Sequence, residues 1–206
     1  MLFIEDLLTT VLQTTGRPDQ KAWALVSLNN CLKELSRTAD YPQDLYETEF
    51  LADDPGGAEL SGPINLPIPE PSTFIINPSY EAVIRKIAYL TYDNQKLIEV
   101  TPHNLMLAGC PELDIFYRNG QNLLVINPSR SYVSFKIGVY CLPSQLMPDT
   151  GIGHWLLDSA SEVLITGAIA KVYKNTGDDA SHDRYFQEYN MMKRQFKLDN
   201  VNSGVV

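Results

Sequence analysis

The chain has 206 residues, of which 44% are apolar and 20% charged, and its formal net charge at pH 7 is −9. This is the composition of a globular protein with room for one well-packed domain, so disorder is confined to local segments. The acidic balance argues against gripping nucleic acid, which requires clustered Lys and Arg, although an acidic wall also suits a channel through which DNA slides.

Two helices are predicted at the N-terminal end. Residues 2–14 carry apolar side chains at helical spacing, and the break at residues 16–19 starts a second helix from about Asp19 to Thr38. The residues expected on the apolar side of the second helix are Trp23, Leu25, Val26, Leu28, Leu32 and Leu35.

The central part of the chain has the pattern of strands and turns. Strands are predicted at residues 45–51, 73–76, 82–92, 96–101, 114–118, 122–127 and 132–141, with one helical turn at 102–107. Asn119-Gly120 lies between two of these strands and is a strong hairpin signal, because both residues tolerate the positive φ of a type I′ turn.

Two amphipathic helices are predicted near the C-terminal end, at residues 155–175 and 182–197, joined by a polar turn at 177–179. We expect His154 to lie at a helix start as a capping or surface residue, and Asp178 or Ser181 to cap the last helix. The apolar series of the last helix consists of Tyr185, Tyr189, Met192 and Phe196.

This order of elements predicts an α+β fold. The N- and C-terminal helices are expected to form an antiparallel helical bundle that carries an inserted antiparallel β-rich region. We expect a single domain over residues 1–206, with the bundle at 1–41 and 152–198, the β-rich insertion at 42–151 and a C-terminal tail at 199–206.

Seven acidic residues and no Lys or Arg fall between Asp40 and Glu59. A solvated acidic rim and an acidic wall that faces a DNA channel both account for this run, and the sequence leaves the two open.

The sequence predicts no catalytic, cofactor-binding or metal-binding residues. The three cysteines, at positions 31, 110 and 141, form no C-x-x-C motif and are expected to be reduced thiols, and the three histidines, at positions 103, 154 and 182, have no metal-ligand spacing. The carboxylate pairs Asp53-Asp54 and Asp178-Asp179 are interpreted as turn and capping residues. The start of the chain lacks the basic residues of a signal peptide, and the longest apolar run is too short to span a bilayer, so we expect synthesis in the cytoplasm and no membrane segment.

Three blocks of the sequence share their order and several residues with a known family. They are a helix pair with Ala22-Trp23 and Leu28-Asn29 that ends at Tyr41-Pro42, a hairpin with Tyr117, Gly120 and Leu124 to Pro128 followed by a strand from Tyr132 to Leu142, and a terminal block with Leu157, Leu164-Ile165, Gly167-Ala168, Tyr173, Tyr185 and Tyr189. Together they resemble the head-to-tail adaptor (connector or neck) proteins of tailed bacteriophages. The resemblance covers nearly the whole chain and depends on the order of the elements more than on any one motif.

The resemblance implies a non-enzymatic structural protein of the virion, located at the head–tail junction, that forms a ring of about twelve copies around a DNA channel. The implied partners are the portal protein, tail proteins of the tube, nozzle or fibre type, further copies of the chain, and genomic DNA that passes through without specific binding. The C-terminal tail is implied to engage the portal through Asp199, Asn200, Val201, Asn202, Val205 and Val206. The acidic, proline-rich stretch from Asp53 to Pro71 matches no element of the family and is interpreted as a docking loop for tail proteins.

Five basic residues of the last two helices have two explanations. In the first, they face acidic residues of a neighbouring copy and set the register between copies in a ring. In the second, they complement the partial negative charge at the C-terminal ends of their own helices. These residues are Lys171, Lys174, Lys193, Arg194 and Lys197.

Two other functions are open at this point. One is a β-rich tail or baseplate protein that binds other virion proteins or host glycans through exposed tyrosines, and the flanking helices weigh against it. The other is an enzyme, such as a glycan hydrolase, that uses one of the carboxylate pairs, and the lack of a convergent acid/base set makes it the weakest.

Overall fold

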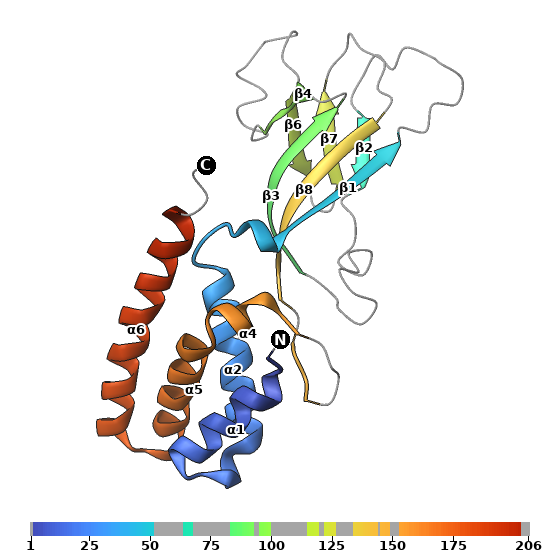
Figure 1. Ribbon diagram of the computed structural model, residues 1–206. Coiled ribbons are helices and arrows are strands. Elements are labelled where there is room, and N and C mark those ends of the chain that lie inside the picture. Colours follow the sequence, from blue (N-terminus) through green and yellow to red (C-terminus); the bar gives the residue numbers. More distant parts are fainter. Residues whose placement is uncertain are drawn as a thin grey trace. The chain divides into compact units, whose positions relative to one another are not determined.

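The computed structural model describes residues 2–51, 64–67, 83–92, 95–99, 115–119, 122–126, 134–143, 145–148 and 153–202. The chain divides into two compact units. The helical unit contains residues 1–44, 77–83 and 142–206, and the β unit contains residues 45–76 and 84–141. Helices and sheets are both present (Figure 1), which confirms the predicted α+β class.

The helical unit contains five α-helices and two short 3₁₀ helices among the described residues. They are α1 (Ile4–Thr15), η1 (Pro18–Gln20), α2 (Lys21–Ser36), η2 (Pro42–Asp44), α4 (Trp155–Ser159), α5 (Ser161–Thr176) and α6 (Asp179–Asn202). The ends of α1 follow from local chemistry. The Asp6 carboxylate accepts a hydrogen bond from the Phe3 N–H at 2.9 Å, and Gly16 ends the helix with a φ of 62°.

The helix predicted at residues 155–175 is interrupted at Ala160, where φ is −135° and ψ is 25°. Hydrophobic periodicity does not reveal this break, because alanine is the best helix former. His154 caps the first part, α4, since its Nδ1 accepts a hydrogen bond from the Leu156 N–H at 3.3 Å. The prediction that His154 lies at a helix start is therefore confirmed.

Helix α6 is longer than predicted at both ends. Asp178 caps it, because the Asp178 carboxylate accepts a hydrogen bond from the Ser181 N–H at 3.1 Å. The helix continues to Asn202, inside the segment predicted as a tail, and residues 203–206 lie outside the described ranges. Side-chain bonds one turn apart support this extension: Gln195 donates to the Asp199 carboxylate at 2.7 Å.

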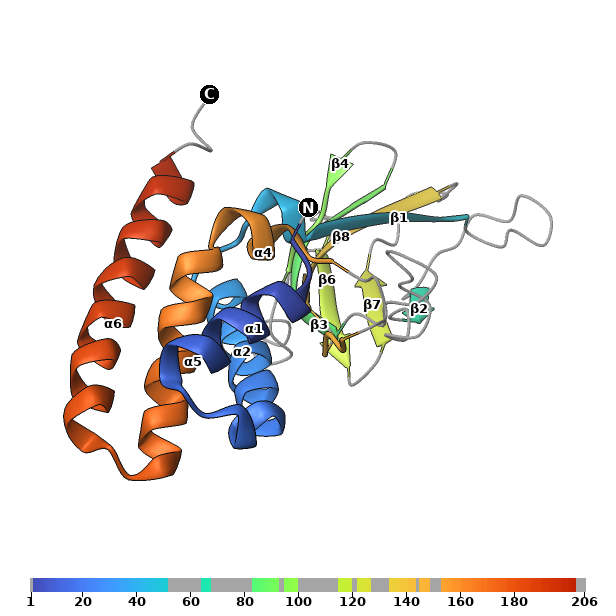
Figure 2. The ribbon, with the colours of Figure 1, turned by 60° about the horizontal axis from the view of Figure 1, so that its bottom comes forward.

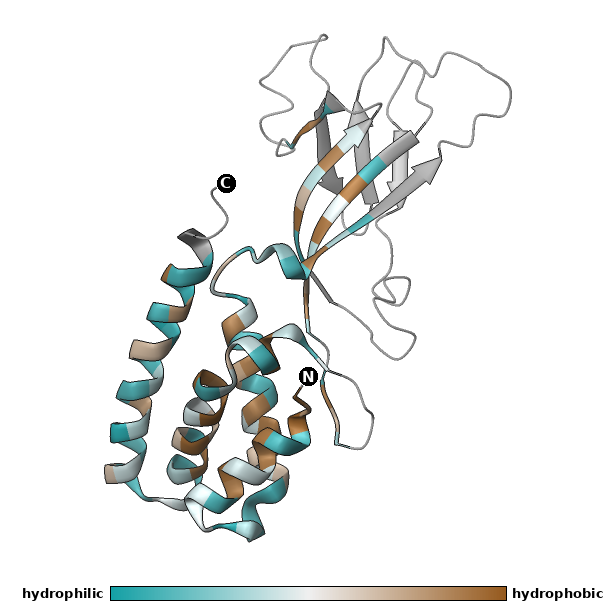
Figure 3. Ribbon diagram, viewed as in Figure 1, coloured by the Kyte–Doolittle hydropathy of each residue, from teal (hydrophilic) through white to brown (hydrophobic). Residues whose placement is uncertain are grey.

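One apolar core joins the helices of this unit. Helix α5 packs against α1, α2 and α6, and Figures 1 and 2 both show α1 and α6 on opposite sides of α5. Colouring by hydropathy shows apolar residues where α1, α2 and α5 meet, whereas α6 is mostly polar (Figure 3). The buried core residues are Ile4, Leu7, Leu8, Val11, Ala24, Leu28, Cys31, Leu32, Leu35, Leu146, Leu156, Leu157, Ala160, Val163, Leu164, Ala168, Ile169, Val172 and Tyr189.

The predicted apolar side of α2 is only partly buried. Leu28, Leu32 and Leu35 belong to the core. Trp23 and Val26 are 43% and 39% exposed, because they lie beside the stripe that α5 covers. Trp23 still contacts α5, since its Nε1–H donates to the Lys171 carbonyl at 3.3 Å.

A buried amide fixes the chain segment that enters α4. The Asn29 side chain donates to the Leu146 carbonyl at 3.0 Å and accepts from the Leu146 N–H at 2.7 Å. Asn29 is 4% exposed and Leu146 is 1% exposed. The side chain therefore satisfies both backbone groups of a buried residue that has no strand or helix partner of its own.

The described residues of the β unit form two four-stranded sheets, with strand orders β1-β8-β3-β4 and β2-β7-β6-β5. The strands are β1 (Leu45–Leu51), β2 (Ile64–Pro67), β3 (Val83–Tyr92), β4 (Gln95–Lys96), β5 (Ile98–Glu99), β6 (Ile115–Asn119), β7 (Asn122–Ile126) and β8 (Ser134–Leu142). The strands predicted at 45–51, 82–92, 114–118, 122–127 and 132–141 are confirmed. Strand β2 was not predicted, and the predicted strand at 73–76 and helical turn at 102–107 lie outside the described residues.

The predicted hairpins form, with small changes. Asn119 pairs with Asn122, so residues 120 and 121, which lie outside the described ranges, connect β6 to β7. The strand predicted at 96–101 is divided into β4 and β5 at Leu97. This residue is buried, and its N–H donates to the Leu90 carbonyl at 2.9 Å. Beyond Leu97 the chain joins the other sheet, where β5 runs parallel to β6, so the prediction of a wholly antiparallel region is wrong here.

The close contact of α5 with α6 and α2 at Gly167 predicts the effect of one substitution. A Cβ added at Gly167 would lie 2.7 Å from the Tyr189 ring and 2.8 Å from the Cys31 sulfur. We expect Gly167→Ala to lower the free energy of unfolding by about 1–2 kcal/mol, because the overlap exceeds the gain in helix propensity. Urea unfolding measures this change. The neighbouring Thr166→Ala serves as the control, and a Gly167→Ala chain as stable as the parent would contradict the contact.

Candidate functional site

A buried carboxylate gathers three segments of the helical unit where 3₁₀ helix η2 ends. Asp44 is 5% exposed, and it accepts hydrogen bonds from the Trp155 Nε1–H at 2.6 Å and the Ser36 hydroxyl at 2.8 Å. Tyr41, only 1% exposed, packs its ring edge against Trp155 at 5.2 Å between centroids. This cluster, the Asp44 cluster, therefore ties α2 to the start of α4.

His154 belongs to the same cluster. Its Nδ1 accepts from Leu156, so the neutral ring carries its proton on Nε2, which lies 3.7 Å from the Asp44 carboxylate. Burial lowers the pKa of His154 from its ordinary 6.5 to about 4. Although Asp44 attracts the charged ring, the desolvation of the imidazolium outweighs this attraction, and the ring is neutral at pH 7.

A second cluster, the Glu34 cluster, holds α6 against α5 and α2. The Glu34 carboxylate accepts from Lys171 Nζ at 2.6 Å and from the Tyr189 hydroxyl at 2.9 Å. The Lys193 ammonium lies over the Tyr189 ring, 4.8 Å from its centroid. Each of the three helices therefore contributes at least one member.

The pKa directions in the Glu34 cluster follow from burial and hydrogen bonding. Burial raises the pKa of Glu34, but the bonds from Lys171 and Tyr189 outweigh it and lower the net value. Burial, together with neighbouring Cys31 and Glu34, raises the pKa of Tyr189. Burial also raises the pKa of the Cys31 thiol to about 11, so this thiol stays protonated at neutral pH and is a poor nucleophile.

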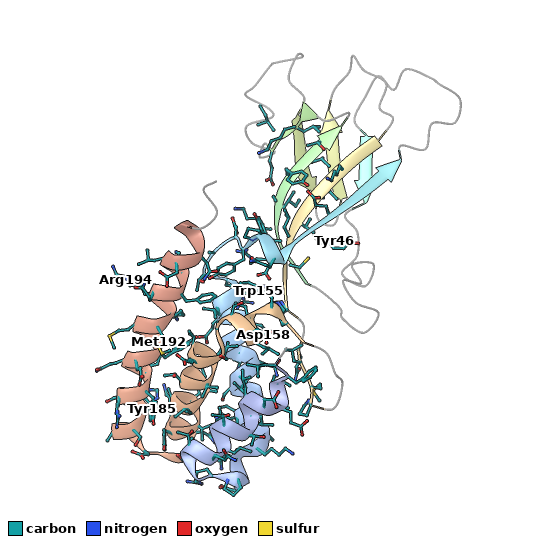
Figure 4. The ribbon with its side chains drawn as sticks, in the orientation of Figure 1. Tyr46, Trp155, Asp158, Tyr185, Met192 and Arg194 are labelled. Atoms are coloured by element: carbon teal, nitrogen blue, oxygen red, sulfur yellow. The ribbon has the colours of Figure 1, made fainter. Side chains whose placement is uncertain are left out.

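The structure divides the five basic residues predicted at a subunit interface into two groups. Lys171 and Lys193 contact Glu34 and Tyr189 within the same chain. Lys174, Arg194 and Lys197 are exposed. Figure 4 shows Arg194 on the side of α6 that is turned away from α5.

Of the residues implied to bind the portal, Asp199 is exposed and Asn200 half-buried on the last turns of α6. The backbone of Val201 and Asn202 is helical, and Val205 and Val206 lie outside the described residues. In the acidic run, Glu47 forms an exposed ion pair with Lys136 at 3.0 Å, whereas Asp44 is buried. A fully solvated acidic rim is therefore wrong at Asp44, which the Trp155 and Ser36 donors satisfy.

Exposed apolar side chains on α6 were not predicted. Phe186, Met191 and Leu198 are 45%, 67% and 48% exposed. None of the three belongs to the apolar series of this helix. Helical spacing therefore places them away from the buried face, and this is how the sequence could have indicated their exposure. Phe186 stacks on His182 with ring centroids 5.3 Å apart, and Met191 and Leu198 flank Arg194.

The β unit has a hollow of about 540 Å³ along β3, β4 and β5. Its lining residues are Lys86, Ile87, Ala88, Tyr89, Lys96, Leu97, Ile98 and Glu99. Across the part of the chain that the structure describes, no group of three or more His, Cys, Asp or Glu residues is arranged to hold a metal ion. No helix within the described ranges is long and apolar enough to cross a membrane.

No model of a protein family matches the sequence, and no curated protein sequence is significantly similar to it.

The Asp44 cluster predicts a loss of stability. We expect Asp44→Ala to lower the free energy of unfolding by about 2–4 kcal/mol, because Trp155 Nε1–H and the Ser36 hydroxyl both lose their acceptor. Asp44→Asn keeps one acceptor oxygen and costs less. Thermal and urea unfolding measure both variants against Gln43→Ala at an exposed neighbouring position. Equal stability of Asp44→Ala and Gln43→Ala would refute the structural role.

The lowered pKa of His154 predicts that the free energy of unfolding depends on pH. Its pKa is lower in the folded chain than in the unfolded chain, so the unfolded state binds more protons and stability falls as pH drops from about 6.5 to about 4. The fall attributable to His154 amounts to at most ~3 kcal/mol. His154→Asn keeps a capping side chain and removes the titration. Urea midpoints across this pH range are expected to fall more steeply for the parent than for His154→Asn, and parallel curves would contradict the assignment.

Proposed function

We propose that the chain is the subunit of a head-to-tail adaptor ring in a tailed-phage virion, which binds the portal, receives the tail and lets DNA pass. In this proposal the terminal helices act as an antiparallel bundle that builds the ring, and the β unit contacts tail proteins. The ring contains about twelve copies. The order of elements and the residues shared with the adaptor family support the assignment.

The observation that carries the proposal is the one-sided burial of α6. This helix is 24 residues long, and among its described side chains only Tyr189 is fully buried. Its outer face carries exposed Met191 and Leu198 beside Arg194. A face that mixes large apolar and Arg side chains is typical of protein–protein interfaces.

The end of α6 supports the portal contact. Asp199 and Asn200 follow Phe196, which packs against the core, on the last turns of the helix. We propose that this end, with Val201, Asn202, Val205 and Val206, binds the portal. An extended helix end buries new surface on a partner without disturbing the core that holds it.

A second candidate function is binding of host glycans or other virion proteins by the β unit. The hollow along β3, β4 and β5 favours it, because Tyr89 lies there with Lys86, Lys96 and Glu99. An aromatic face with charged hydrogen-bonding groups in a hollow is a common arrangement for ligand binding. This candidate is compatible with an adaptor whose β unit points toward the tail.

The adaptor proposal predicts a portal-dependent complex. Native mass spectrometry of the purified chain mixed with the portal protein of the same phage is expected to show about twelve added copies per portal ring. A chain truncated after Leu198 is expected to fold but to bind the portal much more weakly. Lys174→Ala, at an exposed position away from the end of α6, is the control. A full-length chain with no affinity for the portal would refute the proposal.

A further inference from the structure

We propose that adjacent copies of the chain meet through two different surfaces of the helical unit, the outer face of α6 on one copy and the N-terminal end of α1 on the next. This inference rests on the proposed function, since it names the contact by which copies form the ring. The basic surface consists of Met191, Arg194, Lys197 and Leu198, and the acidic surface consists of Leu2, Phe3, Glu5 and Asp6.

The basic surface combines apolar area with positive charge. Met191 and Leu198 are 67% and 48% exposed, and the charged residues Arg194 and Lys197 lie between them in sequence and are also exposed. Neither charged residue forms an ion pair with a described residue of its own chain. Lys193, by contrast, lies over the Tyr189 ring and is excluded from this surface.

The acidic surface has the same construction with the opposite charge. Leu2 and Phe3 are 37% and 42% exposed, and Glu5 and Asp6 are exposed beside them. Neither α1 nor α4 contains a Lys or Arg residue. Asp158 of α4 adds a nearby carboxylate, which accepts from the Leu2 N–H at 2.6 Å.

The two surfaces lie at the same level on opposite sides of the unit. Helix α4 links them, because Trp155 stacks on Phe196 of α6 with centroids 6.4 Å apart, while Asp158 binds the backbone of Leu2. Figures 1 and 2 show α6 and α1 separated by α5, and Figure 4 shows Arg194 and Asp158 on α6 and α4.

This placement fits a second copy of the chain as the partner. Two unlike surfaces on opposite sides of one unit give a heterologous contact, which every copy repeats with the next and which closes into a ring when the rotation allows. With a net charge of −9, copies repel one another overall. Local complementarity between Arg194 or Lys197 and Glu5 or Asp6 counters this repulsion and sets the register.

Charge reversal tests the contact. The first variant, Glu5→Lys with Thr9→Lys, makes the acidic surface basic and leaves the capping residue Asp6 in place. The second variant, Arg194→Glu with Lys197→Glu, makes the basic surface acidic. The third variant carries all four substitutions. Lys21→Glu reverses an exposed charge of α2 outside both surfaces and is the matched control, and circular dichroism verifies that every chain is folded.

Sedimentation velocity at low salt, with each chain alone and with the portal protein, measures assembly. The parent, the control and the four-substitution chain are expected to assemble. The first and second variants alone are expected to assemble at least about tenfold more weakly, and their mixture is expected to recover assembly, because each then meets a complementary neighbour. Added salt is expected to weaken assembly of the parent.

Two results would overturn the contact: two-substitution chains that assemble like the parent, or a folded four-substitution chain that assembles no better than they do. A parent that stays monomeric with and without the portal would overturn the contact and the proposed function together. Failure of the proposed function is distinguishable from these. A parent that self-associates with this charge dependence but ignores the portal supports the contact and overturns the portal as partner. A parent that forms a ring on the portal, as the two-substitution chains also do, overturns the contact alone.

Discussion

The close approach of α5 and α6 at Gly167 is the constraint on which the helical unit depends. Only a residue without a side chain at this position lets the Tyr189 ring reach the Cys31 sulfur across α5. The Tyr189 hydroxyl donates a hydrogen bond to the Glu34 carboxylate, which also accepts a hydrogen bond from Lys171. Because Tyr189 is the only fully buried side chain among those described on α6, this contact decides how α6 is rotated about its axis and which of its residues face outward.

The Asp44 cluster also helps to position α6, at a second point along this helix. The buried Asp44 carboxylate accepts hydrogen bonds from Ser36, 8 residues away in the sequence, and from Trp155, 111 residues away. Trp155 also stacks on Phe196 of α6. The two clusters hold α6 at two points along its length, so that its outer face and the N-terminal end of α1 keep a fixed relation to each other.

Periodicity predicted much of this fold, since the apolar stripes of α1, α5 and α6 and the alternation in β1 and β8 are local patterns. It did not predict the break at Ala160, because alanine carries no helix-ending signal. It also did not predict the parallel pairing of β5 with β6, because this pairing joins Ile98 to Ile115, which lies outside the local pattern around Ile98. The basic residues of the last two helices were recognised as charged positions on the predicted helix faces. Which of them are internally paired depends on Glu34, 137 residues from Lys171, and no local pattern connects the two.

The shallow anchoring of α6 has a consequence for dynamics. Among its described side chains α6 has one that is fully buried, whereas α2 and α5 have several, so α6 is expected to open locally more easily and its amide hydrogens to exchange with solvent first. A neighbour that covers the outer face of α6 is expected to slow this exchange.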